Sequence, residues 1–330
     1  MTNQFPYEMI KKQSRVLLYG AGVIGQEFFW QLRNSPYCTL IGMTDKAFSR
    51  EVEPPFYPIE AIPDLSFDYV VIASTSALTI AEIRLSLLSC GISAEKIVSK
   101  SDYGFIYADA IKDARTFQVQ YEAYRRVIDA YERSDSDFAG ASLYQSLPGL
   151  SLHGRRDTAE RVESYCLRDY IGNSDSVLDI GCNCGFLDME IASFAGKVCG
   201  VDVDREMIAT ANAVRDTLTI KNVAFRCIDI FTEDWEETFD CVFACAIHGV
   251  LIDRCGIDEA EFAERVLRHL KKGGRLFFES HAYRSGETEL HFFALDAIFQ
   301  KYGLHRIFYK YHYGKCAGNL NRDIIVYRAE

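Results

Sequence analysis

Two segments of the chain repeat one order of residue types: an apolar run, a glycine-rich turn and an amphipathic stretch. The first covers residues 15–32, with the turn GAGVIG at 20–25, and the second covers residues 176–194, with the turn GCNCG at 181–185. An apolar run that ends in glycines and continues at helical spacing is typical of a strand, a tight turn and a helix. The sequence therefore predicts two α/β domains, each opened by such a unit.

After each turn, apolar runs alternate with stretches of helical periodicity. In the first series we expect a helix at 78–90 and strands at 39–44, 69–73 and 96–99. In the second we expect a helix at 258–270, ended by Gly273 and Gly274, and strands at 176–180, 197–202, 222–228, 239–245 and 274–279. An antiparallel strand pair at 304–313 and 322–328 completes a seven-stranded sheet. The expected fold is therefore α/β, with two Rossmann-like domains in tandem.

The segment between the two series has the character of a connector. Apolar residues recur at helical spacing from 108 to 133, which predicts one long helix. Residues 143–157 are rich in turn formers and side-chain donors, and a helix at 158–170 leads into the second series. We therefore predict a short Rossmann-like, nucleotide-binding-type domain at 1–104, a helical connector and lid at 105–160, and a second domain at 161–330.

Composition narrows the classes of protein that fit this pattern. The chain has 36 Lys and Arg against 47 Asp and Glu, and its net charge of −11 argues against binding nucleic acid or anionic membranes. No apolar run reaches the roughly 18 residues of a spanning helix, and residues 1–10 lack the layout of a signal peptide. The 11 cysteines are odd in number and scattered through apolar segments, which predicts reduced thiols in a cytoplasmic protein. Cys182 and Cys184 have no second pair at zinc-ribbon spacing, so no metal site is expected.

The segment 177–185 (VLDIGCNCG) resembles the first motif of class I S-adenosylmethionine-dependent methyltransferases. A cofactor with an amino-acid tail lies against the turn after the first strand, so this turn has to be small and its backbone accessible. Gly181 and Gly185 meet this need, and Asn183, where the family usually has glycine, tolerates left-handed backbone geometry. The resemblance runs from about Arg161 to the C-terminus and implies that Asp179 lies near the amino group of the cofactor.

Two further acids stand where this family binds the nucleoside part of the cofactor. Asp202 ends the second strand, where a carboxylate can accept hydrogen bonds from both ribose hydroxyls. Asp229 ends the third strand, and the resemblance implies that it faces the adenine amino group, with Val203 and Ile230 on the two sides of the ring. The joint spacing of the glycine turn and these acids makes S-adenosylmethionine the expected cofactor.

The family transfers a methyl group by in-line displacement, so the protein mainly positions the acceptor and, for a hydroxyl acceptor, removes its proton. The residues from Cys245 to His248 follow the fourth strand and are expected to line the opening beneath the methyl group, with Cys245 among the cofactor contacts. The candidate bases are His248, His281 and Glu279. For His248, a packed residue at a helix start is an equally compatible interpretation, so the sequence assigns no base.

The segment before the second domain carries side chains suited to an anion. These donors are Tyr144, Gln145, His153, Arg155, Arg156 and Arg161. Arginine binds carboxylate and phosphate groups through two hydrogen bonds at once. Any single arginine of the set has a surface ion pair as its alternative role, but the cluster, including Arg161 and Tyr144, predicts a contact to the cofactor carboxylate or to an anionic substrate. Its composition resembles the lid that precedes some small-molecule and tRNA-wobble methyltransferases.

The first glycine turn satisfies the G-x-G-x-x-G pattern between a strand and a helix through Gly20, Gly22 and Gly25. Asp45 follows near the position of a ribose-binding acid. Residues 14–100 resemble the short Rossmann domains that precede catalytic domains in sugar-modifying enzymes of polysaccharide pathways. Three roles stay open for this domain: contact with a nucleotide or nucleotide-sugar, binding of NAD(P), or a ligand-free scaffold that includes dimerisation into a homo-oligomer.

The expected function is therefore an S-adenosylmethionine-dependent methyltransferase with a small sugar-like or nucleotide-linked acceptor, in polysaccharide or secondary-metabolite biosynthesis. One alternative is a tRNA-modifying methyltransferase, which the lid favours and the net charge disfavours. Another is an NAD(P)-binding oxidoreductase or regulator that senses S-adenosylmethionine.

Overall fold

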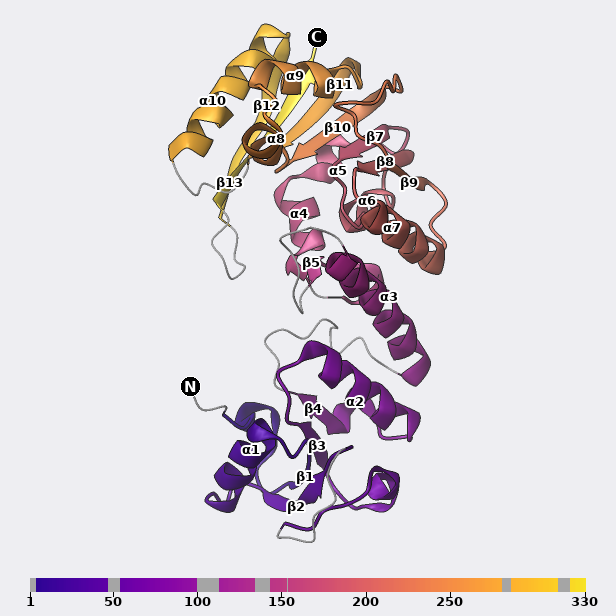
Figure 1. The fold of residues 1–330 in the computed structure, drawn as a ribbon, viewed down its shortest axis with the longest axis vertical. Helices are drawn as coiled ribbons and strands as arrows, with labels where there is room; N and C mark the ends of the chain where they lie inside the picture. Colours follow the sequence, from indigo (N-terminus) through magenta and orange to yellow (C-terminus); the bar gives the residue numbers. More distant parts are fainter. Residues whose placement is uncertain are drawn as a thin grey trace. The chain divides into compact units, whose positions relative to one another are not determined.

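The computed structural model describes residues 4–46, 54–99, 113–133, 143–152, 154–280, 286–313 and 321–330 (Figure 1). The chain forms two compact units. Unit 1 comprises Met1–Arg125 with Leu150–His153, and unit 2 comprises Arg126–Gly149 with Gly154–Glu330. The first boundary falls within helix α3 (Ala114–Arg133). Among the described residues, no helix is both long enough and apolar enough to cross a lipid bilayer.

Unit 1 is built on a parallel sheet in the order β2-β1-β3-β4. Its strands are β1 (Arg15–Tyr19), β2 (Thr39–Thr44), β3 (Tyr69–Ile72) and β4 (Ile97–Ser99). Its α-helices outside α3 are α1 (Val23–Arg33) and α2 (Ala77–Ser89), and its short 3-10 helices are Tyr7–Met9, Ile59–Asp64 and Ala94–Lys96. The strands and helices expected after the first glycine turn are thus confirmed.

The sheet of unit 2 has seven strands, as the sequence predicts, and their order is β12-β13-β11-β10-β7-β8-β9. They are β7 (Ser176–Ile180), β8 (Lys197–Asp202), β9 (Val223–Cys227), β10 (Phe239–Cys245), β11 (Leu270–Glu279), β12 (Leu304–Tyr313) and β13 (Asn321–Ala329). Strand β13 runs antiparallel to both of its neighbours, β11 and β12. Because β8 and β10 flank β7, the winding direction reverses beside β7, and open α/β sheets bind ligands at the carboxyl ends of their strands at such a point.

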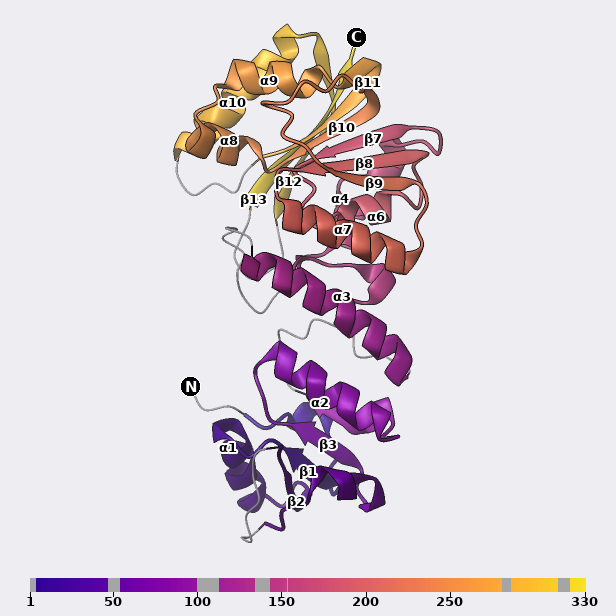
Figure 2. The same ribbon diagram turned by 45° about the vertical axis from the view of Figure 1, so that its right-hand side comes forward.

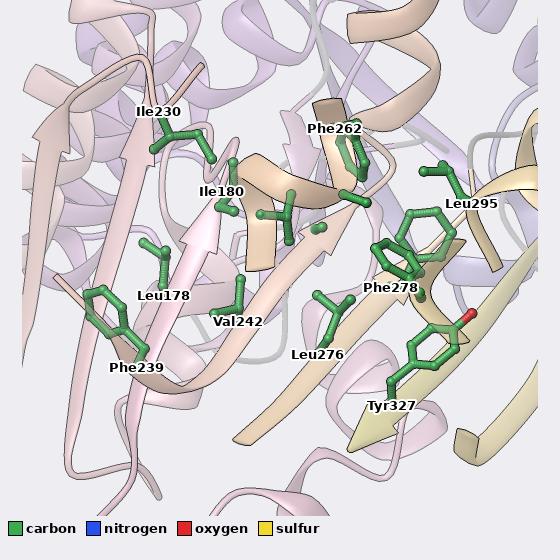
Figure 3. Packing of buried hydrophobic residues seen from close by; sticks show 14 of the residues in the cluster. Leu178, Ile180, Ile230, Phe239, Val242, Phe262, Leu276, Phe278, Leu295 and Tyr327 are labelled. Carbon is green, nitrogen blue, oxygen red and sulfur yellow. The ribbon is translucent and has the colours of Figure 1, made fainter. Parts of the chain in front are cut away.

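Helices cover both faces of this sheet (Figure 2). One face carries α4 (Thr158–Ser164), α6 (Phe186–Ile191) and α7 (Arg205–Leu218), and the other carries α8 (His248–Cys255), α9 (Glu259–Leu267) and α10 (Gly286–Lys301). The second face holds the main core, in which Leu178, Val242 and Leu276 from neighbouring strands pack with Phe262 of α9 and Leu295 of α10 (Figure 3). Burying this face fixes the strand register and so the position of each strand's last residue.

Two expected elements of unit 2 differ from the structure. The predicted helix at 158–170 is wrong as a single element, because Cys166 has φ +53° and separates α4 from α5 (Leu167–Tyr170). A residue in left-handed geometry cannot continue a right-handed helix. The helix predicted at 258–270 ends at Leu267, and Gly273 and Gly274 lie inside β11, because that strand begins earlier than predicted.

The segment expected as an irregular lid contains a short parallel pair, β5 (Leu143–Gln145) and β6 (Gly154–Arg156). Gly154 makes the pairing possible, since a Cβ at this position would overlap the backbone of Gln145. The Ser146 amide donates to the Arg156 carbonyl at 2.9 Å, and the Thr158 amide donates to the Ser146 hydroxyl at 2.7 Å. These hydrogen bonds fix the backbone around Arg156, whose side chain is buried in unit 2.

Candidate active site

The turn between β7 and α6 is shaped by three residues with positive φ: Gly181 at +76°, Asn183 at +56° and Gly185 at +66°. A Cβ at Gly181 would lie 2.6 Å from Cγ2 of Ile247, and one at Gly185 would overlap the ring of Phe225. Asparagine at 183 adopts the left-handed geometry that the sequence predicts for it. The turn is therefore as compact as the predicted cofactor turn has to be.

Asp202 at the end of β8 is bound to this turn. One carboxylate oxygen accepts a 2.9 Å hydrogen bond from the Asn183 amide, and the other accepts one of 3.0 Å from the Asp204 amide. Burial raises the pKa of Asp202, although these amide bonds favour its charged form. The structure thus places an acceptor-rich carboxylate directly beside the glycine turn.

The predicted adenine contacts differ in exposure. Val203 is 66% exposed, which leaves an apolar side chain on the surface next to Asp202. Asp229 is half-buried and accepts a 2.9 Å hydrogen bond from the Phe231 amide. Ile230, in contrast, is buried in the main core, so only Val203 of the expected pair offers an open face.

Asp179 in β7 faces a second acid that the sequence analysis missed. Asp179 and Asp188 of α6 are both buried, and each carboxyl group lies close enough to affect the ionisation of the other. Burial raises the pKa of Asp179 to about 7 and raises that of Asp188 well above its usual range. An available signal for Asp188 is its position between two apolar residues, Leu187 and Met189, near the start of α6.

Glu279 ends β11 and lies at the centre of a charged cluster. Its Oε1 is 2.6 Å from Arg156 Nη2, 2.7 Å from the Tyr165 hydroxyl and 3.2 Å from Arg322 Nη1, and its Oε2 is 3.2 Å from Arg161 Nη2. Burial opposes ionisation of Glu279, but the three arginines outweigh it and hold its pKa well below the usual range. A carboxylate held in this way does not take up a proton at neutral pH, which argues against the predicted role of Glu279 as a base.

The remaining catalytic candidates have different surroundings. His248, the first residue of α8, is fully buried, and its ring centroid is 5.2 Å from that of Phe278 and 6.5 Å from that of Phe262. Cys245 pairs in register with Glu279, and burial raises the pKa of its thiol well above the usual range. His281 lies outside the described residues.

The lid residues are only partly brought together. Arg156 and Arg161 meet at Glu279, and half-buried Tyr144 is close enough to both guanidinium groups to favour their charged forms. Gln145 is buried in β5, while His153 and the side chain of Arg155 lie outside the described residues. Tyr165 and Arg322 complete the cluster, and the sequence analysis missed both of them. The sequence signal for Arg322 is a cation near the start of β13, separated by Asp323 from the apolar run at 324–327.

Unit 1 has its own glycine turn. A Cβ at Gly25 would overlap the Gly20 carbonyl oxygen, so glycine here permits close packing of α1 on β1. Gly22 precedes α1 and has open space around it. Asp45 accepts a 2.7 Å hydrogen bond from the Ala21 amide. The predicted residues Gly20, Gly22, Gly25 and Asp45 thus gather at one turn.

Comparison with known proteins bears on unit 2. Residues 171–307 match the family model described as a methyltransferase domain. Similar curated proteins are phosphoethanolamine N-methyltransferase from Triticum aestivum, 29% identical over 138 residues, and phosphoethanolamine N-methyltransferase 1 from Zea mays, 31% identical over 141 residues. The matches cover 40% and 41% of this chain but only 26% and 27% of those proteins. This chain thus matches about a quarter of the length of these relatives.

Solved structures with related folds include N-methyltransferase NodS from Bradyrhizobium japonicum, 18% identical with a TM-score of 0.42, covering 52% of this chain and 95% of NodS. The [4+2]-cyclase SpnF has a TM-score of 0.44 at 13% identity, covering 65% of this chain and 95% of SpnF. The matched segment lies within unit 2 and includes strands β7 to β11 of its sheet, so the similarity to a methyltransferase domain concerns that unit.

Proposed function

We propose that the protein is an S-adenosylmethionine-dependent methyltransferase that acts on a small acceptor. The observation that carries the proposal is the hydrogen bond between the Asn183 amide and Asp202, which joins a compact positive-φ turn to a strand-end carboxylate within the methyltransferase domain. This arrangement suits a ligand with a ribose beside a flexible tail, because the carboxylate accepts from hydroxyls while the turn leaves its backbone open.

The residues present fit this cofactor. The positive-φ residues Gly181, Asn183 and Gly185 would hold the amino-acid tail, and Asp179 would face its ammonium group. Asp202, which already accepts from the Asn183 amide, would also accept hydrogen bonds from the ribose hydroxyls. The remaining proposed contacts are Val203 and Asp229 at the adenine, Ile230 behind it in the core, and Cys245, Arg161 and Tyr144 on the side of the tail.

When bound, the cofactor supplies a methyl group on a positively charged sulfur, so the chain has little covalent chemistry to do. Its tasks are to orient the acceptor, to exclude water and, for a hydroxyl or ammonium acceptor, to remove a proton. Glu279 is unsuited to that last task because it is held ionised by three arginines. His248 and His281 stay as the proposed bases, although the rings of Phe262 and Phe278 beside His248 suit a packing role equally well.

We further propose a sugar-like or nucleotide-linked acceptor, since unit 1 adds a nucleotide-type turn to the methyltransferase domain. The two curated relatives are named for phosphoethanolamine, which indicates that methylation of small molecules occurs among proteins similar to this domain.

Calorimetric titration with S-adenosylhomocysteine tests the cofactor proposal. We expect the intact protein to bind it with 1:1 stoichiometry and Asp202→Ala to weaken binding at least about tenfold, because the lost bonds are to a charged acceptor. Asp234→Ala is the matched control, since Asp234 is 94% exposed and its one ion pair within the described part of the chain is a 3.8 Å contact with Arg268. Absence of binding to the intact protein, or equal affinity in the Asp202 variant, would refute the assignment.

A further inference from the structure

Three arginines from three different elements converge on one buried carboxylate. Arg156 of β6, Arg161 of α4 and Arg322 of β13 all contact Glu279 of β11, at distances from 2.6 to 3.2 Å. The arginines are 7%, 5% and 4% exposed, and Glu279 is 0% exposed. We call these four residues the arginine site.

The charges of the arginine site do not balance. Three guanidinium groups face a single carboxylate, so two positive charges are in excess. The adjacent polar groups do not offset them, because burial raises the pKa values of Tyr165 and Cys245 and keeps both neutral. Asp179, with a pKa raised by burial to about 7, contributes only part of a negative charge. Buried charges normally have partners, so this excess of positive charge suits the binding of an anion.

The hydrogen-bond donors of the arginine site also indicate an anionic ligand. Arg156 Nη1, Arg161 Nε and Arg322 Nε are buried and have no hydrogen-bond partner among the described residues. Each such donor costs free energy unless a ligand or water accepts from it. Guanidinium groups match the paired oxygens of carboxylate and phosphate groups, so an oxyanion would satisfy both the donors and the charge.

The arginine site lies at the ligand end of the sheet. Glu279 pairs in register with Cys245 at the end of β10, and β10 lies beside β7, which carries Asp179 and the cofactor turn. Of the groups that act on Asp179, Arg161 favours its charged form most strongly. Arg161 therefore lies on the side of the proposed cofactor tail. Arg156 and Arg322 complete the site around Oε1 of Glu279.

We propose that the arginine site binds a carboxylate or phosphate group of the methyl acceptor, so that the substrate is an anionic small molecule. This inference rests on the proposed function. The cofactor tail carries one carboxylate, which can offset one of the two excess charges through Arg161. The other charge, at Arg156 and Arg322, is left for an anion of the acceptor.

The test uses inorganic phosphate as the probe. It is titrated by calorimetry into the full-length protein saturated with S-adenosylhomocysteine, in chloride buffer of matched ionic strength. We expect phosphate to bind while S-adenosylhomocysteine is present, Arg322→Gln to weaken phosphate binding at least about tenfold, and Arg322→Lys to weaken it less. Arg226→Gln is the control, because Arg226 is a surface residue that, among the described residues, forms an ion pair with Glu237 and lies over the ring of Trp235.

Each outcome separates this inference from the proposed function. If S-adenosylhomocysteine binds but displaces phosphate, the arginine site belongs to the cofactor carboxylate and the inference is wrong. It is also wrong if phosphate fails to bind the intact protein, or binds Arg322→Gln and Arg226→Gln equally. If S-adenosylhomocysteine itself fails to bind, the proposed function is what fails. If the Arg322 variants do not fold, phosphate titration of the unmodified protein still tests the inference. Binding in the presence of S-adenosylhomocysteine supports it, and absence of binding contradicts it.

Discussion

The backbone amide of Asn183 donates a hydrogen bond of 2.9 Å to the carboxylate of Asp202. Unit 1 repeats the relationship, since the Ala21 amide donates to Asp45 at 2.7 Å. In unit 2 the turn after β7 is joined to the acid that ends β8, and in unit 1 the turn after β1 is joined to the acid directly after β2. The same local arrangement therefore places a carboxylate beside a glycine-rich turn in two sheets that otherwise differ in strand number.

The repeated contact predicts that unit 1 binds a nucleotide. We expect a nucleotide-sugar such as UDP-glucose, or NADH, to bind the full-length protein, and Asp45→Asn to weaken that binding about tenfold while leaving S-adenosylhomocysteine affinity unchanged. The amide of asparagine still accepts from Ala21, so the turn keeps its geometry. Fluorescence titration of NADH and calorimetry with UDP-glucose measure this, with Asp68→Asn as a control at another acid of unit 1, which binds the Arg15 amide. Failure of both ligands to bind would leave unit 1 with a scaffold role.

The cofactor turn gives a prediction about stability. Gly185 and Gly256 have nearly the same φ, +66° and +67°, but only at Gly185 would a Cβ meet another group, the Phe225 ring. We expect Gly256→Ala to cost about 1 kcal/mol from backbone strain alone, and Gly185→Ala to cost roughly 2–4 kcal/mol because overpacking adds to it. Urea unfolding followed by Trp235 fluorescence in a Trp30→Phe background reports on unit 2. Equal losses of unfolding free energy in the two variants would show that the Phe225 ring moves aside without a cost.

Gly185 and Arg322 illustrate which features of the candidate site can be predicted from the sequence and which cannot. The glycine turns, the strand-end acids and the strand positions along the chain are predictable because local spacing and alternation determine them. The arginine site is not, since it joins β6, α4, β11 and β13 across as many as 123 residues of chain. Which buried polar groups meet depends on tertiary register. The helix break at Cys166 was missed for a related reason, because nothing in the local pattern marks a cysteine for left-handed geometry.

Asp179 predicts a dependence of stability on pH. Its pKa is raised by burial to about 7, whereas an unfolded aspartate titrates near pH 4. The folded protein therefore binds more protons between these values, so the contribution of Asp179 to stability is complete below about pH 4 and is lost as the pH rises towards 7. We expect Asp179→Asn to gain roughly 2–4 kcal/mol relative to the parent over that range. Unfolding curves at several pH values measure the difference, and a pH-independent difference would contradict the raised pKa.

The same acid predicts proton release when the cofactor binds. Besides Asp188, the charged groups that act on Asp179 are Arg161, Asp202 and Glu279. An ammonium group placed beside Asp179 would lower its pKa, so S-adenosylhomocysteine should bind more tightly as the pH rises from 6 to 8 and should release a proton near pH 7. Calorimetry in PIPES and imidazole buffers detects the proton as a difference in binding enthalpy. Proton release that persists in Asp179→Asn would assign it to another group.

Removing the carboxylate at the centre of the arginine site should be among the most damaging single changes in unit 2. Glu279→Gln leaves three buried guanidinium groups without their counter-ion, which typically costs about 3–5 kcal/mol. Glu237→Gln is the matched control, because Glu237 also contacts two cations, Lys197 and Arg226, but at the surface, where the expected cost is below about 1 kcal/mol.

Since an added anion can take the place of the lost carboxylate, millimolar phosphate should raise the melting temperature of Glu279→Gln more than that of the parent or of Glu237→Gln. Thermal unfolding in phosphate and in chloride at equal ionic strength checks this, and an equal response of all three proteins would show that the arginines do not need an anion.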